Sequence, residues 1–179
     1  MIFRAPEPDV EIPDVSLTPF LLRNAEKRGD KAALIDALSG RTLTYRGWAD
    51  GVRKVAAGLS QRGLRKGDVI AIYSPNIPEY AIAFHAVSLL GATVTTINPA
   101  YTVNELSRQL ADSRAKYLLT TSAFLDKATE AGRENNIREI FVIGDSFDAL
   151  LNSEGEAPAV TIDPANDVVA MPYSSGTTG

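Results

Sequence analysis

The residues best suited to chemistry gather at the end of the chain, in the run Ser174, Ser175, Gly176, Thr177, Thr178 and Gly179. Two glycines permit a tight loop whose backbone amides can converge on one point, and four hydroxyls add donors with little bulk. The run begins three residues after Val168–Met171, an apolar stretch that predicts a buried strand. Because open α/β sheets bind ligands in the loops after parallel strands, these residues predict a site for a phosphate or a carboxylate.

Two other interpretations of this loop make different demands on the sequence. On composition alone, the run could equally be a mobile Ser/Gly linker between domains. The run, however, follows an apolar strand without a break and lacks the repetition of flexible linkers. A Walker A loop requires the pattern G-x-x-x-x-G-K-[ST], which is not matched, and the run contains no Lys. We therefore do not expect a P-loop kinase or GTPase.

The remaining candidate residues are better explained by structure than by chemistry. His85 is the only histidine and the chain has no cysteine, so a multi-histidine or zinc site is not expected. His85 falls in an apolar helical stretch and is interpreted as a packed or hydrogen-bonded core histidine, and Trp48 as a core residue. Glu105 is interpreted as a helix cap and Tyr101 is given no role. A charged cluster is interpreted as a solvated loop: Arg62, Arg65, Lys66 and Asp68.

Composition excludes several classes of protein. The 179 residues are 45% hydrophobic and 22% charged, as in an ordinary globular protein. The net charge of −4 and the lack of a basic run argue against nucleic acid as a partner. The most apolar window, Tyr80–Val94, is shorter than the roughly 20 residues that span a bilayer, and no targeting segment is expected. The absence of cysteine suits a reducing compartment, and we expect the cytoplasm.

The elements that must position the terminal loop follow a regular order. Apolar strand-like runs alternate with helix-like segments, which predicts an α/β fold with a mostly parallel sheet and flanking helices. The capping-box sequence Thr102-Val103-Asn104-Glu105 marks one helix start. The predicted strands are Val69–Tyr73, Ala92–Ile97, Tyr117–Thr120, Glu139–Ile143 and Val168–Met171, and the predicted helices are Glu79–Leu90, a segment from Thr102 to Asp112, and Ala123–Asn135.

The N-terminal part predicts a helix and a β-hairpin before this series. Thr18 and Pro19 suggest a helix start, with the helix running to Arg28. The predicted hairpin pairs Ala32–Asp36 with Arg41–Tyr45, and a further helix covers 46–62. We divide the chain into residues 1–67, belonging to a second sheet, a parallel α/β subdomain at 68–151, a linker at 152–166, and the last strand and loop at 167–179.

Four motifs give the sequence a family resemblance. The segment Pro172–Gly179 resembles the phosphate-binding signature of the acyl-adenylate-forming, or AMP-binding, superfamily. Gly40–Tyr45 and Leu89–Val94 are similar to two earlier motifs of the same superfamily. Ile97–Thr102, with Glu105 following, resembles the branch of 4-coumarate–CoA ligases and fatty-acyl–CoA synthetases. The resemblance extends from about Thr18 to Gly179.

The resemblance implies an ATP-dependent, AMP-forming carboxylate–CoA ligase acting on an aryl-propenoic or fatty acid. It implies ATP, Mg²⁺ and coenzyme A as cofactors, with the terminal six residues cradling the β- and γ-phosphates. It also implies that a Pro-Lys-Gly and the catalytic lysine follow the loop. We therefore expect an N-terminal fragment of the large domain that is inactive alone, holds no catalytic residue and self-associates. An adenylation enzyme loading a carrier protein and a stand-alone α/β module for a phosphorylated ligand remain as alternatives.

Overall fold

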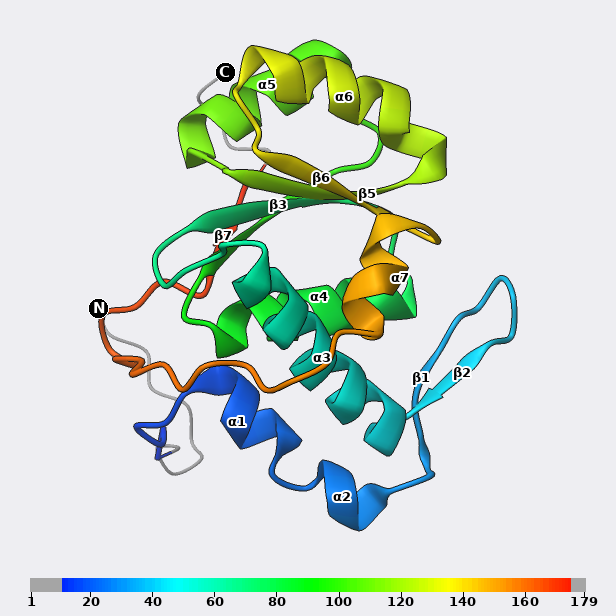
Figure 1. The fold of residues 1–179 in the computed structure, drawn as a ribbon, viewed down its shortest axis with the longest axis vertical. Helices are drawn as coiled ribbons and strands as arrows, with labels where there is room; N and C mark the ends of the chain where they lie inside the picture. The colour runs from blue at the N-terminus through cyan, green and yellow to red at the C-terminus, as the bar shows by residue number, and fades with distance from the viewer. Residues whose placement is uncertain (1–10, 175–179) are drawn as a thin grey trace, which may run out of the picture.

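A computed structural model describes residues 11–174 of the chain, and its centre is a five-stranded parallel sheet (Figure 1). The strand order is β6-β5-β3-β4-β7, and every neighbouring pair is parallel. The predicted α/β fold with a mostly parallel sheet is therefore confirmed. The strands are β3 (Val69–Tyr73), β4 (Thr93–Ile97), β5 (Tyr117–Thr121), β6 (Glu139–Ile143) and β7 (Ala170–Pro172).

Helices cover both faces of this sheet, as crossovers between parallel strands require (Figure 1). One face carries α5 (Val103–Ser113) and α6 (Leu125–Glu134), the latter preceded by a 3-10 turn at Ser122–Phe124. The other face carries α3 (Tyr45–Gln61), α4 (Pro78–Leu89) and α7 (Ser146–Leu151), with α1 (Leu17–Leu22) and α2 (Ala25–Arg28) packed outside them.

The strand side chains divide between two apolar cores, one on each face. Ile70 and Ile72 belong to the core beneath α3 and α4, while Ala71 and Tyr73 belong to the core beneath α5 and α6. Successive side chains of a strand point to opposite faces, so a strand buried on both sides is apolar throughout. This explains why the uninterrupted apolar runs in the sequence predicted the central strands well.

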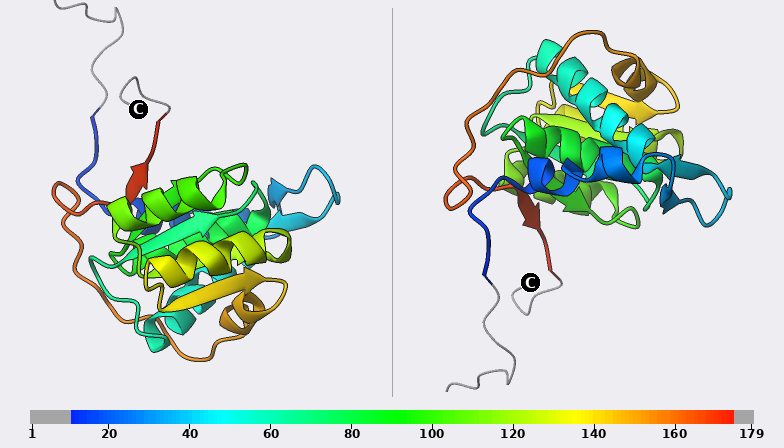
Figure 2. Two further views of the ribbon diagram at one scale, coloured as in Figure 1. Left: turned by 90° about the horizontal axis from the view of Figure 1, so that it is seen from above. Right: turned by 90° about the horizontal axis from the view of Figure 1, so that it is seen from below.

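The predicted hairpin is present and projects from the sheet layer (Figures 1 and 2). Its strands, β1 (Ala32–Ile35) and β2 (Thr42–Thr44), are antiparallel and pair only with each other within the described residues. Arg41 forms an ion pair of 2.6 Å with the nearly buried carboxylate of Glu79 on α4. That contact ties the hairpin to the α/β unit. The assignment of residues 1–67 to a second sheet, and the other domain limits, remain predictions.

The N-terminal helix differs from the prediction. Instead of one helix from Thr18 to Arg28, the chain forms α1 and α2, because α1 packs against α4 whereas α2 packs against α3. Helix α1 begins at Leu17, so Thr18 is not its cap. The fully buried Thr18 hydroxyl instead lies 3.0 Å from Nδ1 of His85 and donates to the His85 carbonyl at 3.3 Å.

The charged cluster before β3 is not simply a solvated loop, which corrects the prediction. Asp68 is 8% exposed, accepts a hydrogen bond from the Arg65 amide at 2.9 Å and pairs with Lys116. A carboxylate at this depth requires such partners, since an unpaired buried charge is costly. Lys66 also pairs with Asp167 at 2.6 Å and so holds the segment that leads into β7.

Two features near the C-terminus were wrong or missing in the prediction. The last strand is shorter than Val168–Met171 and is not buried: β7 pairs only with β4 in the described part of the chain, and Val168 is 55% exposed. Helix α7 was not predicted, although Phe147 and Leu150 stand at the spacing of a helical face and are buried against the rest of the core.

Candidate functional site

The predicted anion-binding loop starts where β7 ends. Of its six residues only Ser174 lies in the described part of the chain, where it is exposed two positions beyond the strand. The others, Ser175, Gly176, Thr177, Thr178 and Gly179, lie outside the described residues. The structure therefore shows where the loop starts and what holds the strand before it, and does not describe the rest of the loop.

Strand β7 presents its carboxyl end at the same sheet edge as the carboxyl end of β4. The two strands are parallel, with Val94 opposite Ala170 and Thr96 opposite Pro172. Beyond β4 the chain turns at Asn98, whose side-chain oxygen accepts the Ala100 amide at 3.0 Å. Ligands of open α/β sheets bind at this edge, outside the carboxyl ends of the strands. Ser174 thus emerges where the fold favours a ligand.

Two threonines of β4 fix the incoming strand through their side chains. The Thr93 hydroxyl donates to the Val168 carbonyl at 2.7 Å, and the Thr95 hydroxyl donates to the Met171 carbonyl at 3.0 Å. The Thr95 hydroxyl in turn accepts from the amide of Gln109, a 4% exposed residue of α5, at 2.9 Å. Buried hydroxyl and amide groups satisfied in this way make a defined network. β7 is held by these bonds in addition to its ladder.

Sequence reasoning did not single out this network. The signal that could have found it is the presence of Thr93 and Thr95 at alternate positions of the predicted strand. Alternate positions share one face of a strand, so both hydroxyls point the same way. The sequence does not show which strand these two hydroxyls would bind.

A tyrosine just before the loop makes the last contact before Ser174. The Tyr173 hydroxyl donates to Oδ2 of Asp112 on α5. Burial, and then the hydrogen bond to Asp112, raises the pKa of Tyr173 to about 12, so the phenol remains a neutral donor at physiological pH. Tyr173 is 42% exposed, so this is a surface contact that orients the chain rather than a core contact.

The next turn along the same edge confirms the capping-box prediction. The Thr102 hydroxyl accepts the Glu105 amide at 3.4 Å, and the Glu105 carboxylate accepts the Thr102 amide at 2.8 Å. Hydrogen bonds from the Thr102 amide and then its hydroxyl lower the pKa of Glu105. Glu105 is therefore an ionised cap, as predicted. Tyr101 packs against the neighbouring core, and its carbonyl accepts from the Tyr73 hydroxyl at 3.1 Å.

His85 and Trp48 lie on α4 and α3, in the helical layer. His85 is half-buried and hydrogen-bonded to Thr18, as the interpretation of a hydrogen-bonded structural histidine predicted, and burial lowers its pKa. Trp48 packs against the core, as predicted, but it is only half-buried, with its ring edge-on to His85 at 5.1 Å. Both residues also line a cavity between the helices and the hairpin.

The described residues offer neither a metal cluster nor a membrane helix. Within residues 11–174, no group of three or more His, Cys, Asp or Glu side chains is placed to bind a metal ion. No helix of that range combines the length and apolarity needed to cross a bilayer.

Comparison with known proteins relates this architecture to a family of ligases. Residues 21–179 match the family described as AMP-binding enzyme. The 4-coumarate–CoA ligase 2 of Petroselinum crispum is 42% identical over 100% of this chain and 34% of its own length. The 4-coumarate–CoA ligase 5 of Oryza sativa subsp. japonica is 41% identical over 99% of this chain, again covering 34% of the relative.

Solved structures agree with this relationship. A long-chain-fatty-acid–CoA ligase from Archaeoglobus fulgidus superposes with a TM-score of 0.88 at 27% identity, covering 98% of this chain and 37% of that one. An anthranilate–CoA ligase, in complex with anthranoyl-AMP, superposes with a TM-score of 0.83 at 27% identity over 94% of this chain and 33% of that one. The chain thus spans about a third of the length of the curated relatives it matches. Because the family match extends over residues 21–179, the chain belongs to the AMP-binding enzyme family.

Proposed function

We propose that this chain forms the first part of an ATP-dependent, AMP-forming carboxylate–CoA ligase, an acid–thiol ligase. Its substrate would be an aryl-propenoic or a fatty acid, because the similar proteins are 4-coumarate–CoA ligases and a long-chain-fatty-acid–CoA ligase. The acid, ATP and coenzyme A would be its small-molecule partners. The cytoplasm remains the proposed location.

The observation that carries the proposal is the way β7 is anchored. The Thr95 side chain holds the Met171 carbonyl of β7, the Thr93 side chain holds the Val168 carbonyl just before the strand, and Tyr173 is held by Asp112, immediately before Ser174. The sequence then continues with hydroxyl residues and glycines to Gly179. A loop that leaves a fixed strand can present its donors with little reorganisation, which is what stabilisation of developing charge requires.

The proposed chemistry has two steps. A carboxylate oxygen attacks the α-phosphorus of ATP, forming the acyl-adenylate and releasing pyrophosphate. The coenzyme A thiolate then attacks the acyl carbonyl carbon and releases AMP. In the first step negative charge builds on the departing pyrophosphate. The amides and hydroxyls of Ser174, Ser175, Gly176, Thr177, Thr178 and Gly179 would donate to its oxygens and lower that barrier.

Mg²⁺ would be bound chiefly by the phosphates. The loop supplies hydroxyl oxygens, which suit a hard cation, whereas residues 11–174 contain no cluster of carboxylates or histidines arranged for one. The ion would offset phosphate charge when bound. This chain's contribution would be to hold the phosphate oxygens in place.

The 179-residue chain by itself is proposed to be inactive and to self-associate. The relatives carry about twice as many further residues, since the chain covers 34% of the first of them, and holding two reactants in attack geometry needs a complete site. Exposed apolar side chains at Ile35, Leu38 and Val168 support association, because such groups favour contact with another surface.

The experiment uses the protein encoded by the complete reading frame, incubated with ATP, Mg²⁺, coenzyme A and, separately, 4-coumarate, palmitate and anthranilate. We expect AMP, pyrophosphate and one acyl-CoA thioester by mass spectrometry. Hydroxylamine added without coenzyme A should trap the acyl-adenylate as a hydroxamate. Formation of ADP and phosphate would overturn the proposal. A hydroxamate without any thioester to coenzyme A would support the alternative acceptor, a carrier protein.

A further inference from the structure

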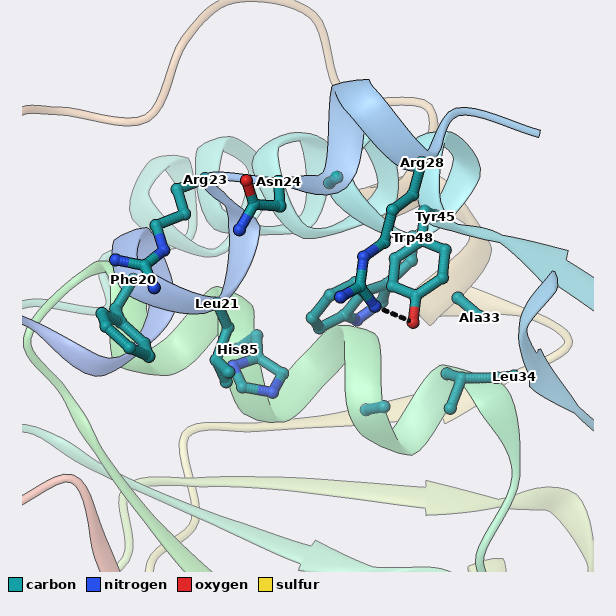
Figure 3. A pocket seen from close by; sticks show the side chains of 12 residues that line it. Phe20, Leu21, Arg23, Asn24, Arg28, Ala33, Leu34, Tyr45, Trp48 and His85 are labelled. Atoms are coloured by element: carbon teal, nitrogen blue, oxygen red, sulfur yellow. Dashed lines mark hydrogen bonds between the residues drawn. The ribbon is translucent and has the colours of Figure 1, made fainter. Parts of the chain in front are cut away.

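A cavity of about 450 Å³ lies between the N-terminal helices, the hairpin and α4 (Figure 3). Its volume falls in the roughly 300–1,000 Å³ range of small-molecule sites. No residue of β7 and neither Tyr173 nor Ser174 lines it. The cavity is therefore separate from the sheet edge to which the proposed function is assigned, and a ligand bound in it would not depend on that function.

The charged residues of the cavity are all cations. Among the side chains that the structure describes, Arg23 and Arg28 line it and no carboxylate does. The Arg28 guanidinium donates to the Tyr45 hydroxyl at 2.7 Å and lies over the same ring, 4.9 Å from its centre (Figure 3). The Arg23 guanidinium lies over the Phe20 ring at 3.9 Å. Neither arginine is engaged with an acidic side chain in the described part of the chain. A guanidinium without a carboxylate partner retains donors for an incoming anion.

An indole N–H adds a donor that lacks an acceptor. Nε1 of Trp48 is shielded from solvent and has no hydrogen-bond partner in the described part of the chain. Buried polar groups are nearly always paired in native proteins, so an unpaired one calls for an explanation. Trp48 lines the cavity, so a turn of its ring towards the open volume would let a ligand oxygen supply the missing acceptor.

Apart from Asn24 and His85, the rest of the lining is apolar or aromatic. Leu21, Ala25, Leu34 and Ala81 contribute alkyl surface, and the rings of Tyr45 and Trp48 flank it. Ligand sites of this kind bury an apolar body and orient it with a few polar groups. Aromatic walls favour an aromatic body, because offset and edge-to-face ring contacts add to the burial of area.

We propose that this cavity binds a small organic carboxylate with an aromatic body. The carboxylate is held by the guanidinium of Arg28 and lies within reach of the Trp48 indole, and the ring occupies the apolar part of the cavity. An uncharged ligand would leave the guanidinium unpaired. A bare anion such as phosphate would leave the apolar walls empty.

The test uses the 179-residue chain, because Trp48 is its single tryptophan, at a dilution where sedimentation shows a monomer, since self-association through the hairpin would lie beside the cavity. Fluorescence excited at the red edge of indole absorption therefore reports on this cavity alone. The chain is titrated with benzoate, with its uncharged isostere benzamide, and with inorganic phosphate. We expect a saturable change with benzoate, and at least about tenfold weaker binding of the other two, since a charge-assisted bond and an apolar contact are each absent from one of them.

Two matched variants complete the test. Arg28→Gln should weaken benzoate binding by about tenfold or more, because it removes the charged donor from an exposed side chain. Arg133→Gln, on the exposed face of α6 across the sheet, should bind like the parent chain. Circular dichroism checks the fold of both. No saturable change with benzoate, equal binding of benzamide or phosphate, or an unaltered Arg28→Gln titration would each overturn the proposal.

Discussion

The sheet edge at β7 and the helical cavity beside α4 differ in whether their polar side chains have hydrogen-bond partners within the protein. At the edge, Thr93, Thr95 and Gln109 all have partners within 3.0 Å, and these partners belong to the protein. Around the cavity, the Trp48 N–H has no partner in the described part of the chain and Arg28 has only a neutral hydroxyl. The edge is thus complete without a ligand, whereas the cavity contains groups that a ligand would complete.

The difference teaches which observation points to which role. A fully satisfied network positions the segment after it, in this case the loop that starts at Ser174, and its own groups are not free to bind anything. Unsatisfied donors next to open volume indicate binding at the groups themselves. Polar residues in the two regions should therefore respond differently to substitutions of similar size.

Thr95→Val should give the largest stability change. The substitution keeps the shape of the fully buried side chain but removes the donor to Met171 and the acceptor of Gln109. Groups left unsatisfied in this way cost about 1–3 kcal/mol. Urea unfolding should show this loss, and the amides of β7 should exchange faster. Thr161→Val, on an exposed segment, serves as control and should stay within about 0.5 kcal/mol of the parent. Equal stability of the two variants would contradict the conclusion that the Thr95 hydrogen bonds hold the sheet edge together.

His85→Asn should remove an acid sensitivity of the cavity region. Burial lowers the pKa of His85 below its ordinary value near 6.5, so the unfolded chain takes up a proton before the folded chain does. Stability is therefore full above that ordinary value and falls as pH drops towards the folded pKa, by at most about 1.4 kcal/mol per pH unit for one proton. The Asn side-chain amide can still hydrogen-bond with the Thr18 hydroxyl, which itself donates to the backbone carbonyl of residue 85. Urea unfolding at pH 7.5 and 5.5 should show a smaller difference in the variant than in the parent.

Tyr173→Phe should have a small effect on stability and a clear spectroscopic one. Because the pKa of Tyr173 is raised to about 12, its contribution to stability is present below the ordinary phenol pKa near 10 and is lost as pH rises towards 12. The difference in phenolate absorbance between parent and variant should therefore titrate near 12. Asp112→Asn should lower that value, since it removes the carboxylate that accepts the hydrogen bond. Titration of the difference at the ordinary value would show that the contact does not form.

Trp48→Phe should have the smallest effect on stability. It deletes an N–H that already lacks a partner, so the loss of packing is offset by the removal of an unpaired donor. We expect a change within about 1 kcal/mol in urea unfolding. A loss as large as that of Thr95→Val would mean that the indole N–H is satisfied and that the cavity is as complete as the sheet edge.

The sequence predicted features that depend on neighbouring residues in the chain, and it missed features that depend on contacts between distant segments. The limits of β3 and β6 and the capping box of α5 were predicted because buried apolar runs and caps depend on neighbours in the chain. The break between α1 and α2 and the burial of Asp68 depend on contacts with distant segments. No local pattern encodes such contacts.

The candidate site divides in the same way. The run from Ser174 to Gly179 was found from residue types and motif, both of which are properties of the sequence. The residues that anchor the strand before it, Thr95 and Asp112, became evident only when β7 was seen beside β4 and α5. Trp48 packs against the core as predicted, but its place at a cavity was missed because helical spacing gives the buried face and not the empty volume beside it.

The central claim is that the terminal loop holds the phosphates during adenylation. Its most direct test is ATP–pyrophosphate exchange by the protein from the complete reading frame, comparing the parent with Thr177→Ala and the surface control Thr161→Ala. Loss of one hydroxyl bound to a charged phosphate oxygen, worth about 1.5–3 kcal/mol, should slow exchange by about 10- to 150-fold in Thr177→Ala and leave Thr161→Ala unchanged. An exchange rate for Thr177→Ala equal to that of the parent would contradict the assignment of this loop to the phosphates.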